Sequence, residues 1–143
     1  MRLHIYADGA CWGNPGPAAI GAVIKDEERK KLIEISEYLG KGTNNQAEYK
    51  AVIAALKSAL KFNADEVVLY LDSELIIRQL AGEYKVKNAL LRPLYMELAG
   101  LLKKFKSLSI NQVGHFGNEE AHALAKAALK GRARAGDSSL TDS

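Results

Sequence analysis

Residues 67–71 (VVLYL) form a nearly continuous apolar run that ends in Asp72 and Ser73. Such a run is typical of a strand that is buried on both faces of a sheet. The segment before it, residues 47–61, is rich in helix-favouring residues, and its apolar positions recur at helical spacing. A strand reached through a helix implies a right-handed crossover and parallel pairing. The pattern therefore predicts an α/β fold in which this strand lies beside the first strand of the chain.

The start of the chain has a different pattern. Three strand-like runs, residues 3–7, 18–24 and 32–39, precede the helix, and a short charged linker (KDEERKK) joins the last two. A linker of that kind favours an antiparallel hairpin. An antiparallel start followed by a parallel strand predicts a mixed sheet. It excludes a Rossmann-like small-ligand domain, whose glycine fingerprint is also missing from the sequence.

The remaining segments complete one α/β domain. We expect a short helix at 74–80, a longer helix at 90–106, a last strand at 108–113 and a final helix at 119–129. From Gly131 the chain is polar and rich in small residues. The sequence therefore predicts a domain at 1–130 and a disordered tail at 131–143.

Composition limits the classes of protein that need to be considered. The chain has 143 residues, one cysteine and a formal net charge of +3. A single cysteine excludes an internal disulfide, and we find no signal segment and no apolar run of membrane-spanning length. We therefore expect a cytoplasmic monomer without an obligate protein partner, whose charge permits a polyanionic ligand.

Three carboxylates far apart in the sequence are the candidate site. Asp8 follows the first strand-like run and precedes a loop rich in Gly and Pro, whereas Asp72 ends the buried strand. Carboxyl ends of neighbouring parallel strands are where open α/β sheets place their sites. Glu48 lies four residues before Val52, on the apolar face of its helix, where a carboxylate is costly unless it is paired or metal-bound. Its alternative role is to complement the helix dipole from a solvated first turn.

Clustered carboxylates repel one another, and divalent cations between their oxygens relieve that repulsion. Oxygen ligands without thiolates favour Mg²⁺, with Mn²⁺ as a possible substitute. Two such ions about 4 Å apart can hold a phosphodiester, activate water and steady the leaving oxygen.

Four motifs in order resemble type 1 ribonuclease H: DGACWGNPGP at Asp8, TNNQAEYKA around Glu48, LDSELII at Asp72 and GHFGNEEAHALA before the last helix. The resemblance covers residues 2–130. It implies a five-stranded mixed sheet of order 3-2-1-4-5 and two-metal endonucleolytic hydrolysis of the RNA strand of an RNA–DNA hybrid. The products would carry 5′-phosphate and 3′-hydroxyl ends. The family's metal-ligand carboxylates correspond to Asp8, Glu48 and Asp72.

One departure from the family pattern concerns the last helix. The family usually has a fourth acidic residue where this chain has His122. One interpretation is a weakened or inactive site; the other, which we favour, is that the imidazole binds the metal or moves a proton near neutral pH. Glu119 and Glu120 are alternatives, although they lie at other helix angles. His115, in the preceding loop, matches a histidine implicated in proton transfer or product release.

The resemblance also implies contacts with the substrate. The matching positions in the first two motifs are Cys11, Asn14, Asn44, Asn45 and Gln46, and Trp12 is a further candidate that would pack on a sugar or base. Amide groups can test for a 2′-hydroxyl, although Asn44 and Asn45 also suit helix capping and Trp12 suits a local apolar cap. The long basic protrusion of better-known members is absent, so binding would rest on Tyr84, Lys85, Lys87 and Asn88 and should be weak and salt-sensitive.

Two other classes of protein share part of this pattern. A resolvase-type nuclease or another polynucleotidyl transferase uses the same carboxylates but should lack the TNNQAE and DGACWGNPGP segments. A non-catalytic hybrid-binding module would lack one of the three acidic residues, and all three are present.

Overall fold

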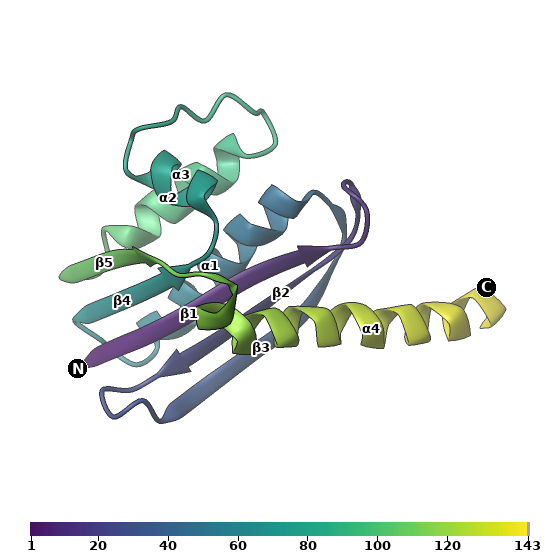
Figure 1. The fold of residues 1–143 in the computed structure, drawn as a ribbon, viewed down its shortest axis with the longest axis horizontal. Helices are drawn as coiled ribbons and strands as arrows, with labels where there is room; N and C mark the ends of the chain where they lie inside the picture. Colours follow the sequence, from purple (N-terminus) through teal and green to yellow (C-terminus); the bar gives the residue numbers. More distant parts are fainter. Residues whose placement is uncertain (143) are drawn as a thin grey trace.

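The computed structural model describes the backbone of residues 1–142 and the side chains of residues 1–131. It contains a five-stranded sheet of order β3-β2-β1-β4-β5 with helices on both faces (Figure 1). The elements are β1 (Arg2–Cys11), β2 (Gly16–Lys25), β3 (Lys31–Gly42), α1 (Asn44–Leu60), β4 (Glu66–Leu71), α2 (Glu74–Leu80), α3 (Arg92–Leu102), β5 (Ser107–Gln112), the 3₁₀ helix η1 (His115–Asn118) and α4 (Glu119–Asp142).

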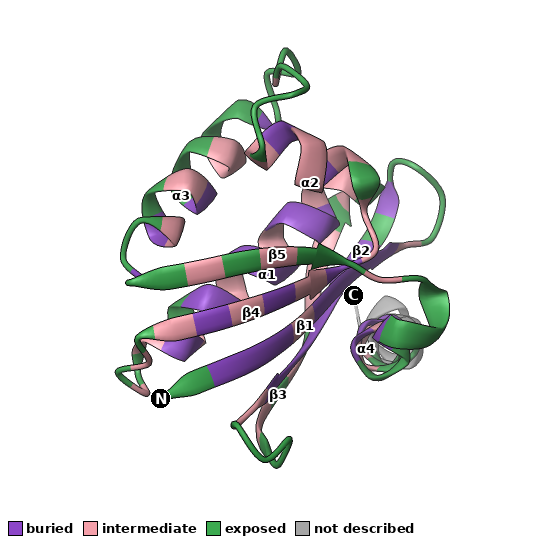
Figure 2. Cartoon of the chain, turned by 60° about the vertical axis from the view of Figure 1, so that its left-hand side comes forward, coloured by how far each residue is buried: buried purple, intermediate pink, exposed green. Residues whose placement is uncertain are grey.

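The strand pairing confirms the predicted mixed sheet. β1 pairs with β2 and β2 with β3 in antiparallel fashion, whereas β1–β4 and β4–β5 are parallel. The parallel pairs arise because α1 connects β3 to β4, and α2 and α3 connect β4 to β5. Both crossovers place their helices on one face of the sheet, while α4 packs on the opposite face against β1, β2 and β3 (Figure 2).

The main core lies between the sheet and α1. Its side chains include Leu3 and Ile5 of β1, Leu56 of α1 and Leu69 of β4, all with no exposed surface. A second, smaller cluster lies under α4 and consists mainly of alanines together with Leu129. Small residues there let the α4 backbone approach the sheet closely. None of the helices in the described part of the chain combines the length and apolar character needed to cross a lipid bilayer.

Several element boundaries differ from those predicted. β1 continues to Cys11 rather than ending at Ala7, because Asp8, Gly9, Ala10 and Cys11 all pair with β2. α3 spans only residues 92–102, and α4 continues past residue 129 to Asp142. The side chains beyond residue 131 lie outside the described part, so the division into a domain and a disordered tail stays a prediction.

α4 approaches the sheet closely at Gly21, which pairs with Asp8 across β1 and β2. A Cβ atom at Gly21 would overlap the backbone carbonyl of Ala121 and the backbone nitrogen of Ala125. Position 21 therefore has to be glycine for α4 to keep its place beside Asp8.

We predict that Gly21→Ala displaces α4 and lowers the free energy of unfolding by about 3 kcal/mol, measured by urea denaturation. Gly100→Ala is the matched control, because a Cβ atom there meets nothing within 4 Å and lies in α3. Alanine at that position should stabilise the protein by about 0.5–1 kcal/mol. Equal effects of the two substitutions would contradict the close approach of α4.

Candidate active site

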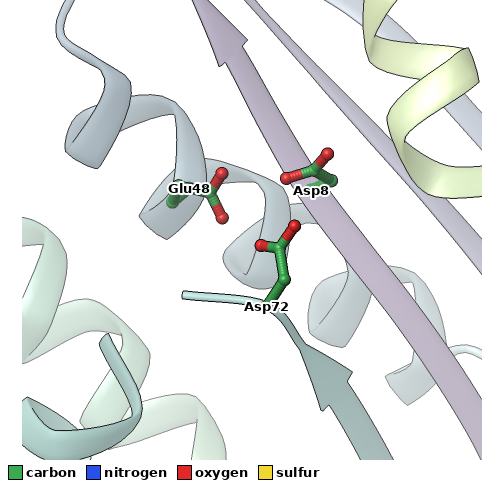
Figure 3. Close-up of side chains that lie close together, drawn as sticks. All are labelled: Asp8, Glu48 and Asp72. Atoms are coloured by element: carbon green, nitrogen blue, oxygen red, sulfur yellow. The ribbon is translucent and has the colours of Figure 1, made fainter. Parts of the chain in front are cut away.

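Three acidic side chains from three different elements converge at one point (Figure 3). Asp8 lies in β1, Glu48 in the second turn of α1, and Asp72 directly after β4. One carboxylate oxygen from each lies within 4.8 Å of the others. Asp8 is 3% exposed and Glu48 6%. The convergence predicted from the sequence is therefore present, and it lies in a largely buried environment.

The position of Asp8 corrects one expectation. It lies inside β1 rather than at the end of that strand, since it is paired with Gly21 of β2. The parallel pairing with β4, however, stops at Tyr6 and Tyr70. Asp8 is thus the second residue past that pairing, and Asp72 occupies the equivalent place after β4. The two carboxylates meet where β1 and β4 separate.

Backbone contacts fix α1 against β1 at this point. A Cβ atom at Gly9 would overlap the backbone of Ala47 and Glu48, so only glycine allows the approach. The Gly9 backbone N–H donates to Glu48 Oε1 at 3.2 Å. The helix start is itself fixed by a capping box, in which Thr43 Oγ1 accepts from the Gln46 N–H and Gln46 Oε1 accepts from the Thr43 N–H.

The carboxylates oppose one another's ionisation. Burial, reinforced by Asp8 and then by Asp72, raises the pKa of Glu48 to about 10. Burial and the Asp8 charge also raise the pKa of Asp72. A divalent cation between these oxygens would favour their ionised forms, and a set of hard oxygen donors suits Mg²⁺ or Mn²⁺. The donor set therefore fits such a cation.

His122 of α4 lies beside the three carboxylates. Its Nδ1 lies 2.7 Å from Asp8 Oδ2, so the two form an ion pair whenever the imidazole is protonated. The His115 ring meets the His122 ring edge-on, with centroids 5.1 Å apart. Both histidines, Asn44, Ser73 and the three carboxylates border a cleft of about 330 Å³. Glu120 instead pairs with Lys25 and Lys31 away from the cleft.

Asn118 is a residue whose role the sequence did not indicate. Asn118 ends η1, directly before α4, and is 1% exposed. Its Nδ2 donates to the Ala7 carbonyl oxygen at 3.0 Å, which ties the start of α4 to β1. Hydrogen bonding from Asn118 also works against the rise in the pKa of Asp72. In the sequence, an asparagine just before a helix that starts with two glutamates indicates an N-cap. Only the contact with Ala7 in the folded structure shows that Asn118 also ties α4 to β1.

The predicted substrate contacts divide into two groups. In the first, the loop between β1 and β2 joins the start of α1, since Asn14 Oδ1 accepts from the Asn44 backbone N–H at 3.0 Å. Asn44 also borders the cleft. The carbonyl oxygens of Gly13 and Gly42 lie 2.6 and 3.2 Å from Cys11 Sγ, which can donate to one of them at a time, and Trp12 is 43% exposed. Asn45 is half-buried in the first turn of α1.

The second group lies on the connector between α2 and α3. Tyr84, Lys85 and Lys87 border a separate cavity and are not among the residues that line the carboxylate cleft. Asn88 Oδ1 accepts from the Leu90 backbone N–H at 2.8 Å, so this side chain shapes the connector. Of the predicted substrate contacts, the structure therefore places Asn44 at the carboxylate cleft, with Asn14 bonded to it, and places the second group at a different cavity.

Comparisons with known proteins agree with this geometry. A protein-family model described as "Reverse transcriptase-like" matches residues 6–128. Ribonuclease HI of Halobacterium salinarum is 43% identical over 128 residues, which cover 90% of this chain and 64% of that protein. Ribonuclease H of Polynucleobacter asymbioticus is 39% identical over 142 residues and is covered to 87%. The chain spans only 37% of the bifunctional protein Rv2228c of Mycobacterium tuberculosis, to which it is 36% identical.

Solved structures give the same result. The crystal structure of RNase H1 from Halobacterium salinarum matches with a TM-score of 0.88 and 42% identity, covering 91% of this chain and 98% of that one. LC11-RNase H1, crystallised in complex with an RNA/DNA hybrid, matches with a TM-score of 0.85 and 38% identity over the same shares.

The raised pKa of Glu48 predicts the pH dependence of stability in EDTA. Between its ordinary value near 4.5 and about 10, the folded protein holds a proton that the unfolded chain releases. The free energy of unfolding therefore falls as pH rises from about 4.5 to about 10. Glu48→Gln removes the dependence and should raise the free energy of unfolding at pH 8 by about 2 kcal/mol, measured by urea denaturation.

Glu120→Gln is the control with the opposite sign, because Lys25 and Lys31 lower the pKa of Glu120. The ionised Glu120 side chain stabilises the fold at pH values above the ordinary glutamate pKa, and this stabilisation is lost as pH falls through its lowered pKa. The substitution should therefore lower the free energy of unfolding slightly at pH 8. A Glu48→Gln variant that is less stable than the parent at pH 8 in EDTA would contradict the description of the cluster.

Proposed function

The chain belongs to the ribonuclease H family, and we propose that it hydrolyses the RNA strand of RNA–DNA hybrids by a two-metal-ion mechanism. The products are 5′-phosphate and 3′-hydroxyl ends. The observation that carries the proposal is the convergence of Asp8, Glu48 and Asp72 at one buried point with their oxygens within 4.8 Å. A structural role does not require three carboxylates to meet in this way, because their mutual repulsion is costly without cations.

The three carboxylates would hold two Mg²⁺ ions, with Mn²⁺ as a substitute. When bound, such ions polarise the scissile phosphate and lower the pKa of an attacking water. Asp8 lies close to both Asp72 and His122. Glu48 is held in place by the Gly9 N–H. Metal binding requires the carboxylates to be ionised, and the bond from the Gly9 N–H keeps the Glu48 carboxylate directed at the other two.

His122 supports turnover as a proton carrier beside the cleft. Its Nδ1 faces Asp8, so its Nε2 is left to exchange a proton with water or with the departing oxygen. His115 stands beside it and shares the cleft, which suits a second proton carrier or a group that helps product leave.

The first group of predicted contacts supplies the recognition of RNA. Asn14 and Asn44 are joined by a hydrogen bond at the mouth of the cleft, where their remaining amide groups can test for a 2′-hydroxyl. We propose that Cys11, Trp12, Asn45 and Gln46 contribute mainly through the shape of the same surface. Gln46, for example, uses its Oε1 in the capping box.

Support for the substrate comes from LC11-RNase H1, which has been crystallised with an RNA/DNA hybrid and shares 38% identity with this chain. We propose that Tyr84, Lys85, Lys87 and Asn88 add contacts to the hybrid from the connector. We further propose a monomer that acts in the cytoplasm. A polynucleotidyl transferase on the same scaffold is the competing function, and the substrate panel described next separates the two.

The test is cleavage of labelled RNA–DNA hybrid, double-stranded RNA and double-stranded DNA with Mg²⁺, Mn²⁺ or EDTA. We expect metal-dependent cleavage of the hybrid's RNA strand, reduced by about 10³-fold or more in Asp72→Asn because a ligand carboxylate is lost. Asp65→Asn is the matched control, since Asp65 is exposed and only weakly paired with the N-terminus at 3.9 Å. A folded Asp72→Asn variant with the parent rate would overturn the assignment.

The role of His122 has its own test. His122→Ala should lower kcat by about 10- to 100-fold with little change in KM, because a proton carrier is lost while binding is kept. His122→Asp should retain more activity. Glu119→Gln, in the same helical turn, controls for a glutamate acting instead. If the alanine variant turns over at the parent rate, His122 has no part in the mechanism.

A further inference from the structure

A second cavity, of about 340 Å³, lies between α2, the connector that follows it and α3. The connector arches away from these helices at one end of the molecule (Figure 1). None of the residues that line this cavity also lines the carboxylate cleft. Its lining includes Gln79, Tyr84, Lys85, Lys87, Arg92 and Tyr95. The volume lies at the lower end of the range for small-molecule sites.

The lining of the cavity includes Gln79, whose side-chain amide has one unused end. Gln79 is only 6% exposed, and its Oε1 accepts a hydrogen bond from the Tyr49 hydroxyl at 2.6 Å. That bond fixes the orientation of the amide. Within the described part of the chain, the Gln79 NH₂ group has no acceptor. Its nitrogen is not among the buried polar atoms that lack a partner, so this donor is accessible from the cavity and can bond to a ligand that supplies an acceptor.

The rim of the cavity carries uncompensated positive charge. Lys85, Lys87 and Arg92 all line it, and none forms an ion pair with a carboxylate among the described residues. Arg78, by contrast, is neutralised by Glu74 at 2.7 Å and Glu83 at 2.6 Å. Three unpaired cations around one opening attract an anion, and phosphate is the anion that lysine and arginine commonly bind.

Aromatic side chains provide the walls. Tyr84 is 46% exposed, and the Arg78 guanidinium lies 5.5 Å from its ring centroid, which restrains the ring. Tyr95 lies on the α3 side. Tyrosine rings of this kind accept a stacked nucleobase.

We propose that this cavity binds a single nucleotide, with its base between the tyrosines and against the Gln79 amide and its phosphate on Lys85, Lys87 and Arg92. The nucleotide is either free or the end residue of a single strand. The bond from Gln79 to Tyr49, the residue after Glu48, links this site to the helix that carries a candidate metal ligand. The site shares residues with the proposed hybrid contacts, but its occupancy does not depend on cleavage.

The test is a two-dimensional NMR titration of the ¹⁵N-labelled full chain in EDTA, where no cleavage occurs. AMP should give saturable shifts in the Gln79 side-chain amide and the backbone signals of Tyr84 and Lys87. Ribose 5-phosphate and adenosine should each bind at least about tenfold more weakly, because each lacks half of the contacts. A 5′-phosphorylated tetradeoxyadenylate separates the sources: tighter binding than AMP indicates a strand end, and binding of AMP alone indicates a free nucleotide.

Substitutions test both halves of the site. Gln79→Glu keeps an oxygen for the Tyr49 hydroxyl but loses the donor, and the double variant Lys87→Gln with Arg92→Gln loses two cations. Each should weaken AMP binding by about tenfold, whereas Lys126→Gln on the exposed face of α4 should have no effect. The double variant leaves the buried pair intact and so decides the matter if Gln79→Glu does not fold. Shifts absent from the cavity, or equal for AMP and ribose 5-phosphate, would overturn the proposal whether or not the chain cleaves hybrid.

Discussion

Electrostatic repulsion among Asp8, Glu48 and Asp72 is the constraint that the packing around the site has to overcome. Asp8 and Glu48 are each less than a tenth exposed, and Asp72 adds a third acidic group within 4.8 Å. At that range a pair of like charges costs about 3–4 kcal/mol at an effective dielectric constant near 20. Left alone, the side chains would turn apart or take up protons, and burial together with the Asp8 and Asp72 charges raises the pKa of Glu48 to about 10. The surrounding structure has to hold them together until cations compensate the charge.

The fold does this through close backbone packing on both sides of β1. Gly9 admits the start of α1 on one face, and Gly21 of the neighbouring strand admits α4 on the other. The first contact positions Glu48, and the second brings His122 within hydrogen-bonding distance of Asp8. Asn118 then ties the start of α4 to the Ala7 carbonyl. The geometry of the site is therefore a consequence of how the helices pack, so changes that move either helix should also change the chemistry.

Much of this arrangement follows from local sequence patterns, and the rest depends on tertiary contacts. The apolar run at 67–71 and the helix before it predict the parallel crossover, and Glu48 on an apolar helix face predicts a buried carboxylate. Asp8 was expected at the end of a strand, but pairing with β2 extends β1 through Cys11, which no local signal shows. Likewise, nothing around Asn118 distinguishes a helix cap from a buried tie to β1.

The central claim is that the fold holds Asp8, Glu48 and Asp72 together as a divalent-cation site. The most direct measurement is the thermal unfolding midpoint in Mg²⁺ or Mn²⁺ relative to EDTA, for the parent and for a triple variant with Asp8→Asn, Glu48→Gln and Asp72→Asn. A ligand that binds only the folded state raises the midpoint, and the rise grows with the logarithm of the ligand concentration once that exceeds the dissociation constant. We expect metal to stabilise the parent and to leave the triple variant unchanged. Equal shifts in the two proteins would contradict the account, because the cations would then bind elsewhere.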